Sequence, residues 1–177
     1  MAERTISSRR AFEGHLINLR VDEVQLASGR RARREVVEHP GAVGILAWDG
    51  GRLAMVRQWR QPAGAELLEI PAGTLEPDEA PAMTARRELA EECGLNAREW
   101  EPGPSFYTAP GFCTERLSLF VATGLEPAED VSAPDDEELE PSWLDLSEAL
   151  TAIDDGRVVD AKSVAGILWL ARRTGNG

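Results

Sequence analysis

The sequence has few of the residues that mark disulfide-bonded, zinc-binding or membrane proteins. Only two of its 177 residues are cysteines, Cys93 and Cys113. Their spacing is not that of a metal site, so we interpret them as reduced thiols. No run approaches the roughly 18 apolar residues that a membrane span needs. The opening MAERTISSRR has no apolar stretch behind it, which predicts neither a signal peptide nor an anchor. We therefore expect a cytoplasmic protein with no membrane partner.

Basic residues are also scarce relative to acidic ones. Nineteen Lys and Arg against thirty-one Asp and Glu give a formal net charge of −12, which repels a nucleic-acid backbone. Nucleic acid is therefore not an expected partner. An acidic enzyme can still bind phosphates if metal ions or a few placed arginines supply positive charge locally. His15 and His39 are isolated and form no nucleophile–base pair, so covalent catalysis has little support.

The first part of the chain is expected to form strands. The apolar content of the whole chain, 42% over 177 residues, suits one compact core. Ala11 to Val37 alternates around a glycine-containing turn, which predicts a β-ribbon within residues 1–40 ahead of a main domain at 41–177. Ala42 to Trp48 is nearly continuous apolar sequence, and Asp49-Gly50-Gly51 separates it from LAMVRQW. That order predicts a hairpin.

A strand and a helix follow. Glu66 to Ile70 alternates and ends at Pro71-Ala72-Gly73, a loop expected to need glycine's conformational freedom. Pro81 to Cys93 has helical periodicity, and Gly94 stands where a C-cap glycine belongs. The predicted buried stripe consists of Ala82, Ala85, Leu89 and Cys93.

The last third predicts a strand, an acidic loop, a second strand after that loop, and two helices. Arg116 to Gly124 alternates as a strand, and Glu126 to Glu140 is acidic and contains proline, as in long loops. One helix is expected to start with Ser147 as its N-cap, and another covers Ala161 to Arg172. The whole order predicts an α/β (α+β) fold, a mixed β-sheet with helices on its faces.

Three glutamates on the helix are the candidates for chemistry. Glu88, Glu91 and Glu92 stand at i, i+3 and i+4, which places them on one face, opposite the apolar stripe. Hard oxygen ligands on a rigid helix suit Mg²⁺ or Mn²⁺. A solvated face balanced by Arg86 and Arg87 is the alternative. A metal site further requires that the three carboxylates converge and leave room for a cation.

The segment Gly73 to Leu95 as a whole favours the metal site. It matches the pattern GX5EX7REUXEEXGU, with U aliphatic, at all nine fixed positions over twenty-three residues. The chain thus resembles the Nudix hydrolases, which implies a mixed β-sheet sandwiched between helices. The matching residues are Gly73, Glu79, Arg87, Glu88, Leu89, Glu91, Glu92, Gly94 and Leu95.

The resemblance implies a role for each residue of the motif. Glu88 and Glu92 would be the principal ligands of Mg²⁺, with Mn²⁺ as a possible substitute, and Glu91 would assist them. The backbone carbonyl of Ala72 would join these ligands. Arg87 and Glu79 would pair as orienting residues, while Gly73 and Gly94 serve the backbone geometry. When bound, such ions neutralise a pyrophosphate and activate a water for in-line attack.

Three further features resemble the ADP-ribose pyrophosphatase branch of the family. They are VRQWRQPAGAELLEIPAG, then Pro110 in YTAPGFCTERLSLF, and the acidic loop PDDEELEPSW. This similarity implies hydrolysis of ADP-ribose to AMP and ribose 5-phosphate. A GDP-mannose or broader nucleoside diphosphate sugar hydrolase is one alternative. A Nudix-like protein that binds ADP-ribose without cleaving it is another, although the complete glutamate set argues against it.

The same resemblance implies substrate contacts and a general base. Arg57 and Arg60 suit phosphate or ribose oxygens, and a surface ion-pair residue is the alternative for Arg57. Trp59 is expected to pack on the base, on a dimer partner or in the core. Glu137 in the acidic loop aligns with the base, with Asp135, Asp136, Glu138 and Glu140 as rivals. The remaining expected contacts are Arg33, Glu35 and Glu115.

The resemblance also implies a homodimer in which the N-terminal ribbon is exchanged, so that both chains complete each site. Two departures from the family stand out. The ribbon is expected to be shorter than in relatives. Pro141 also stands where a strand residue usually sits, which a sheet tolerates only at an edge or at a strand's first residue.

Overall fold

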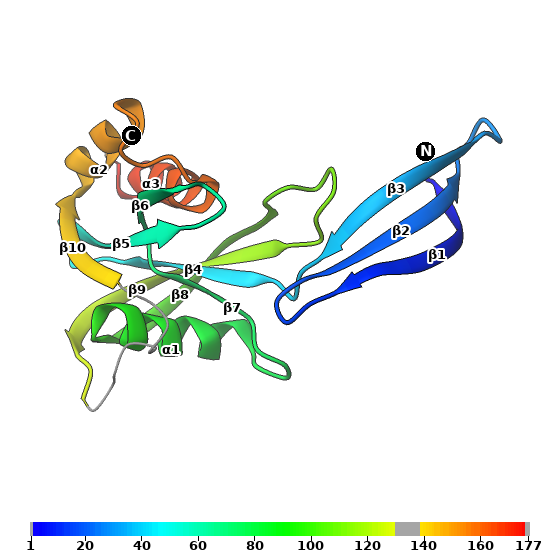
Figure 1. Ribbon diagram of the computed structural model, residues 1–177. Helices are drawn as coiled ribbons and strands as arrows, with labels where there is room; N and C mark the ends of the chain where they lie inside the picture. The colour runs from blue at the N-terminus through cyan, green and yellow to red at the C-terminus, as the bar shows by residue number, and fades with distance from the viewer. Residues whose placement is uncertain (1, 130–138, 176–177) are drawn as a thin grey trace. The chain divides into compact units, whose positions relative to one another are not determined.

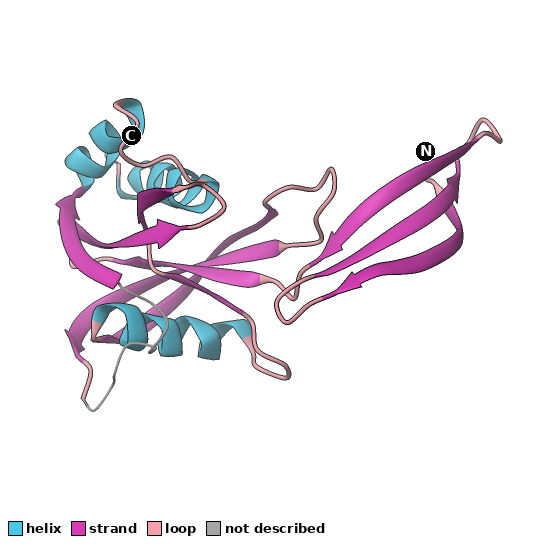
Figure 2. Cartoon of the chain, viewed as in Figure 1, coloured by secondary structure: helices cyan, strands magenta, loops and turns pink. Residues whose placement is uncertain are grey.

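The computed structural model describes residues 2–129 and 139–175, which form two compact units (Figures 1 and 2). The first contains the chain up to Gly41 together with Phe106–Arg116. The second contains Ala42–Ser105 and the chain from Leu117 onward. Among the helices of the described ranges, none combines the length and apolar character needed to cross a membrane.

The first unit is an antiparallel ribbon of three strands. β1 (Arg4–Glu13), β2 (Asn18–Gln25) and β3 (Arg31–Glu38) lie in that order. β1 is exposed along its whole length, so main-chain pairing with β2 defines it and no buried alternation reveals it in the sequence. The ribbon therefore starts at Arg4, before the residue Ala11 from which the alternation of the sequence was followed.

The second unit contains two sheets. A four-stranded mixed sheet has the order β7-β4-β9-β8, in which β4 runs parallel to β9 and antiparallel to β7. A three-stranded antiparallel sheet has the order β10-β5-β6. The strands are β4 (Ala42–Ala47), β5 (Arg52–Arg60), β6 (Ala65–Glu69), β7 (Ala72–Thr74), β8 (Leu95–Tyr107), β9 (Arg116–Pro127) and β10 (Leu139–Asp145).

The core of this unit is built around β4, which is buried on both faces. Its residues Val43 and Ile45 join a cluster with Ala85 and Leu89 of α1 (Pro81–Cys93). On the opposite face α3 (Ala161–Thr174) approaches so closely that a Cβ on Gly166 would lie 3.1 Å from Leu46 Cδ2. α2 (Leu146–Asp154) packs against α3 and β10. Burial on both faces explains why β4 reads as a continuous apolar run.

The predicted hairpin between β4 and β5 is wrong. The turn exists, because Asp49 Oδ1 accepts hydrogen bonds from Gly51 N at 3.0 Å and Arg52 N at 2.6 Å. Beyond it, a single bridge between Trp48 and Leu53 joins the strands before they enter different sheets. A central strand with two buried faces needs a partner on each edge, and β7 and β9 take both edges of β4.

Smaller differences concern the helices and the loops beside them. α2 begins at Leu146 with Asp145 as its N-cap, so Ser147 lies inside the helix. On α1, Ala82 is exposed, and Thr84 and Glu92 are buried together with Ala85 and Leu89. β8 was not predicted at all, because most of its residues are exposed. Pro141 lies within β10, which is tolerated because β10 is an edge strand.

Candidate functional site

The local sequence of α1 fixes where its carboxylates stand. Pro81 begins the helix, and Gly94 ends it in the left-handed conformation, with φ 62° and its N–H bonded to Ala90 O at 2.9 Å. Leu89 is fully buried and anchors the helix against the sheet. Glu88 and Glu91 are consequently half-buried at its border.

Arg87 is the centre of an ion-pair cluster on this helix. Its Nη2 donates to Glu79 Oε2 at 3.1 Å and its Nε to Glu79 Oε1 at 3.3 Å. Its Nη1 donates to Glu88 Oε1 at 2.8 Å and to Glu91 Oε2 at 2.9 Å. The bidentate hydrogen bonds to Glu79, together with the charge of Glu88 and the hydrogen bond to Glu91, raise the pKa of Arg87. The hydrogen bonds from Arg87 and then Thr84 hold the pKa of Glu79 below its ordinary value. Both groups are therefore charged at neutral pH.

Glu92 stands one helical turn beyond Glu88 and contacts β7. Its side chain is only 5% exposed, and its Oε2 accepts a hydrogen bond from Ala72 N at 2.9 Å. The prediction that all three glutamates lie opposite the buried stripe is therefore wrong for Glu92, and Glu88 and Glu91 are only partly exposed. The neighbouring Cys93 is also shielded, and burial together with the charge of Glu92 raises the pKa of its thiol to about 12. Both cysteines are free thiols.

Gly73 is required for space and not for backbone freedom. Its φ is not positive, unlike that of Gly94. A Cβ built at Gly73 would overlap the side chain of Glu88. β7 therefore passes directly against this carboxylate, and only glycine fits while Glu88 keeps this rotamer. This close approach corrects the interpretation of Pro71-Ala72-Gly73 as a loop that needs glycine's conformational freedom.

The chemistry of these residues suits a hard divalent cation. Glu79, Glu88, Glu91 and Glu92 carry four formal negative charges against the single positive charge of Arg87, and carboxylates are the ligands that Mg²⁺ and Mn²⁺ prefer. Gly73 forms a cradle for one of them. Within residues 2–129 and 139–175, however, no group of three acidic, histidine or cysteine side chains is already arranged to hold a metal. Arg87 bridges Glu88 and Glu91 in this conformation, so a cation would have to replace that bridge.

The predicted substrate residues of β5 have different environments. Arg57 lies on the surface, with its Nη1 3.9 Å from Glu66 Oε2. Trp59 is 58% exposed and its Nε1 donates to Gln61 Oε1 at 2.9 Å, which excludes the core alternative within this chain. Arg60 is half-buried, and its Nη2 donates to Glu69 Oε2 at 2.8 Å.

Glu69 connects Arg60 to α3, and its importance was missed at the sequence level. It is 1% exposed and also accepts a hydrogen bond from Lys162, whose Nζ lies 3.0 Å from Asp160 Oδ2. Burial alone would raise the pKa of Glu69, but Arg60 and Lys162 more than offset it and hold the pKa below its ordinary value. The signal in the sequence was a glutamate at the end of a strand, directly before Ile70.

Comparisons with known proteins identify the family. A model described as the NUDIX domain matches residues 38–166. The chain belongs to the Nudix family. Residues 3–37 match a model described as the nucleoside diphosphate sugar hydrolase N-terminal domain.

Two Nudix relatives and one solved structure show the extent of the similarity. The chain is 41% identical to a methanol dehydrogenase activator of Bacillus methanolicus, over 95% of this chain and 92% of that protein. It is 40% identical to an ADP-ribose pyrophosphatase of Bacillus subtilis (strain 168), over 96% and 93%. A crystal structure of an ADP compounds hydrolase has the same fold, with a TM-score of 0.87 at 19% identity, covering 100% of this chain and 98% of that one.

The remaining predicted Nudix site residues lie in the first unit or outside the described ranges. Arg33 and Glu35 share one exposed face of β3, opposite Glu23 and Val21 of β2. Glu115 accepts a hydrogen bond from Thr108 Oγ1, and its Oε1 lies 3.8 Å from His39 Nδ1. The predicted base Glu137 and its rivals Asp135, Asp136 and Glu138 lie outside the described residues. Glu140 is exposed on β10.

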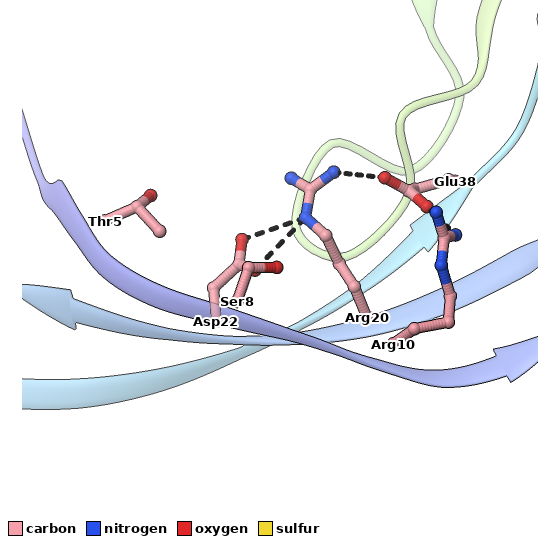
Figure 3. A pocket seen from close by; sticks show the side chains of 6 residues that line it. All are labelled: Thr5, Ser8, Arg10, Arg20, Asp22 and Glu38. Carbon is pink, nitrogen blue, oxygen red and sulfur yellow. Dashed lines mark hydrogen bonds and ion pairs between the residues drawn. The ribbon is translucent and has the colours of Figure 1, made fainter.

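The ribbon of this Nudix protein carries a polar pocket on one face (Figure 3). Arg20 forms ion pairs with both acidic residues of the pocket, with its Nε 3.0 Å from Asp22 Oδ2 and its Nη1 2.6 Å from Glu38 Oε1. Arg10 pairs with Glu38 as well. Hydrogen bonds from Ser8 and then Arg20 hold the pKa of Asp22 below its ordinary value. The two arginines are thus neutralised, which leaves the pocket no net charge with which to attract a phosphate.

Proposed function

We propose that this Nudix protein is a divalent-metal-dependent enzyme that hydrolyses the pyrophosphate of ADP-ribose to AMP and ribose 5-phosphate in the cytoplasm. The observation that carries the proposal is the acidic face of α1, which faces a glycine that leaves room for one carboxylate. The relative named ADP-ribose pyrophosphatase, which matches over nearly the whole chain, supports the choice of substrate.

Glu88, Glu91 and Glu92, with the carbonyl of Ala72, would hold Mg²⁺, or Mn²⁺ as a substitute. When bound, the cation would neutralise the pyrophosphate and activate the attacking water. The chain's own contribution is orientation. Ala72 N fixes one oxygen of Glu92. Arg87 can keep its two hydrogen bonds to Glu79 while it releases the other glutamates, because different N–H groups make them.

The substrate is assigned to side chains around this helix. Arg60, held by Glu69, would donate to a phosphate, because a guanidinium presents several N–H groups to phosphate oxygens. Arg57 and Trp59 are the exposed residues beside it. Glu137 would accept a proton from the attacking water, since a general base needs only to reach it by a hydrogen bond.

A homodimer would complete the site. In this arrangement the domain at residues 41–177 receives Arg33 and Glu35 from the ribbon, residues 1–40, of a second copy. Both side chains are exposed on β3 and hence available for such a contact. Glu115 is the remaining residue assigned to the substrate or the metal.

The decisive experiment compares kcat/KM for ADP-ribose, GDP-mannose and UDP-glucose in Mg²⁺. A clear preference for ADP-ribose is expected. Equal values would replace this proposal with a general nucleoside diphosphate sugar hydrolase, which the N-terminal family description also fits. EDTA should abolish turnover and added Mg²⁺ should restore it. Tight ADP-ribose binding without turnover in Mg²⁺ would instead indicate a sensor.

A further inference from the structure

Gln58 of β5 is a buried polar residue with an unpaired oxygen. Its side chain is 7% exposed, and its Oε1 has no hydrogen-bond partner and no contact with solvent. Buried polar atoms are nearly always hydrogen-bonded, so an unpaired one requires an explanation. Two other buried oxygens of the described residues lack a partner: Asn18 Oδ1 in the ribbon, and Asp160 Oδ1, whose carboxylate accepts through its second oxygen from Ser163 N at 3.1 Å.

The strand register shows which way Gln58 projects. β5 pairs with β6 and β10 without a bulge, so alternate residues share one face of the sheet. Ala54 lies on the same face as Gln58 and belongs to the core cluster that contains Ala85 and Leu89 of α1. Gln58 therefore lies on the same buried face of β5 as Ala54.

Arg60 is the next residue along β5 on this face. Two residues along a strand span about 6.5 Å, so an acceptor and a guanidinium stand side by side. Arg60 is held in place by Glu69. A ligand that met both groups would present a hydrogen-bond donor to Gln58 and an anionic oxygen to Arg60.

We propose that Gln58 is a specificity-determining residue whose Oε1 accepts a hydrogen bond from a hydroxyl of the substrate's terminal sugar. This inference rests on the proposed hydrolysis of a nucleoside diphosphate sugar. An amide oxygen only accepts hydrogen bonds, whereas ionised phosphates offer only acceptors, so the partner of Gln58 must be another group. A sugar hydroxyl next to the phosphate bound by Arg60 supplies the donor. A site built around such a hydroxyl discriminates strongly against analogues that lack it.

The test measures kcat/KM of the wild type and of the Gln58→Met variant on ADP-ribose and on substrate analogues. Methionine has a similar length but no amide, and wild type and variant are compared on ADP-ribose and on analogues whose terminal sugar lacks its 2- or 3-hydroxyl. We expect kcat/KM for ADP-ribose to be about 10- to 100-fold lower in the variant than in the wild type. On the deoxy analogue that lacks the hydroxyl bonded by Gln58, kcat/KM of the two proteins should differ less than about threefold. Equal losses on all these substrates would overturn the proposal. A loss that disappears only with inosine diphosphate ribose would assign Gln58 to the base amino group, and would also overturn it.

The stability of the substrate-free protein gives a second readout. A purely structural glutamine would lose stability on replacement, whereas removal of an unpaired buried oxygen should leave Tm unchanged or raise it. A lower Tm for Gln58→Met would therefore contradict the inference. Gln25→Met, at a residue in the ribbon whose side chain accepts a hydrogen bond from Arg4, is the matched control and should retain wild-type kinetics. Failure of the wild type to cleave ADP-ribose would refute the proposed function, and this is measured first.

Discussion

Replacement of Gly73 by alanine tests whether the acidic face of α1 is a metal site. The new Cβ would overlap the side chain of Glu88 from its carboxylate to its Cγ. Because Gly73 has no positive φ, alanine fits the backbone conformation of β7. The substitution therefore acts on the position of one carboxylate, which must rotate away from the strand.

The effect is expected in metal binding more than in folding. Moving a flexible side chain to another rotamer should change the free energy of unfolding by about 1 kcal/mol. A displaced ligand should weaken metal affinity about 10- to 100-fold, by analogy with the loss of a supporting contact. At a concentration about 100 times its wild-type Kd, Mg²⁺ stabilises the folded protein by about 2.7 kcal/mol, and this gain would drop to between about 1.4 and 0.4 kcal/mol.

Thermal unfolding with and without Mg²⁺ measures this difference. At roughly 2 to 4 °C per kcal/mol for a chain of this size, Mg²⁺ should raise the Tm of the wild type by about 5 to 11 °C. The Gly73→Ala variant should show half of this rise or less. Gly94→Ala is the matched control, because it strains a left-handed residue with nothing within 4 Å of its Cβ and should lower Tm without changing the response to Mg²⁺. An undiminished Mg²⁺ response in Gly73→Ala would refute the reasoning.

Two other substitutions probe the residues around this site. Glu92→Gln should lower turnover by two or more orders of magnitude, because it removes a metal ligand. The fold should survive, because the amide oxygen still accepts a hydrogen bond from Ala72 N. Near-normal turnover in steady-state kinetics would exclude the assigned role. Glu69→Gln should lower the free energy of unfolding by about 2 kcal/mol at pH 7, less than for a fully buried pair because Arg60 is partly exposed. The pKa of Glu69 is lowered in the folded state, so the contribution of its carboxylate to the free energy of unfolding is present above about pH 4.5 and disappears as pH falls through the folded pKa. Urea unfolding should therefore show a smaller difference between wild type and Glu69→Gln at pH 3 than at pH 7. The same difference at both pH values would contradict this.

The sequence predicted the elements whose burial follows a simple period. α1 was predicted with its observed bounds, because a helical repeat of apolar residues ends at Gly94. β4 was visible as an apolar run because both of its faces are covered. The predicted β4–β5 hairpin failed because a turn specifies the reversal of the chain but not the pairing that follows it. β1 and β8 had no buried alternation to detect, since main-chain hydrogen bonds define both strands.

The motif identified the acidic residues of α1 but not their surroundings. Sequence spacing placed Glu92 with Glu88 and Glu91 on one open face, whereas the passage of β7 beside the helix buries Glu92 and leaves the others at the border. The burial of Gln58 could have been predicted from the sequence. This residue lies two residues beyond Val56 in an alternating strand, and therefore on a buried face, where a polar side chain requires a partner.

The single arginine of the acidic face offsets part of the repulsion among four clustered carboxylates. Like charges at i, i+3 and i+4 destabilise a helix. Arg86, the second arginine considered as a counter-charge, stacks instead over Trp100 with its guanidinium 5.0 Å from the ring centre. Arg87 alone bridges Glu79, Glu88 and Glu91. Different N–H groups of Arg87 bind Glu79 and the pair Glu88 and Glu91, so the hydrogen bonds to Glu79 can persist when those to Glu88 and Glu91 break. The three formal negative charges that remain in excess after this pairing are the physical basis on which we propose that a divalent cation binds here in place of the bridge from Arg87.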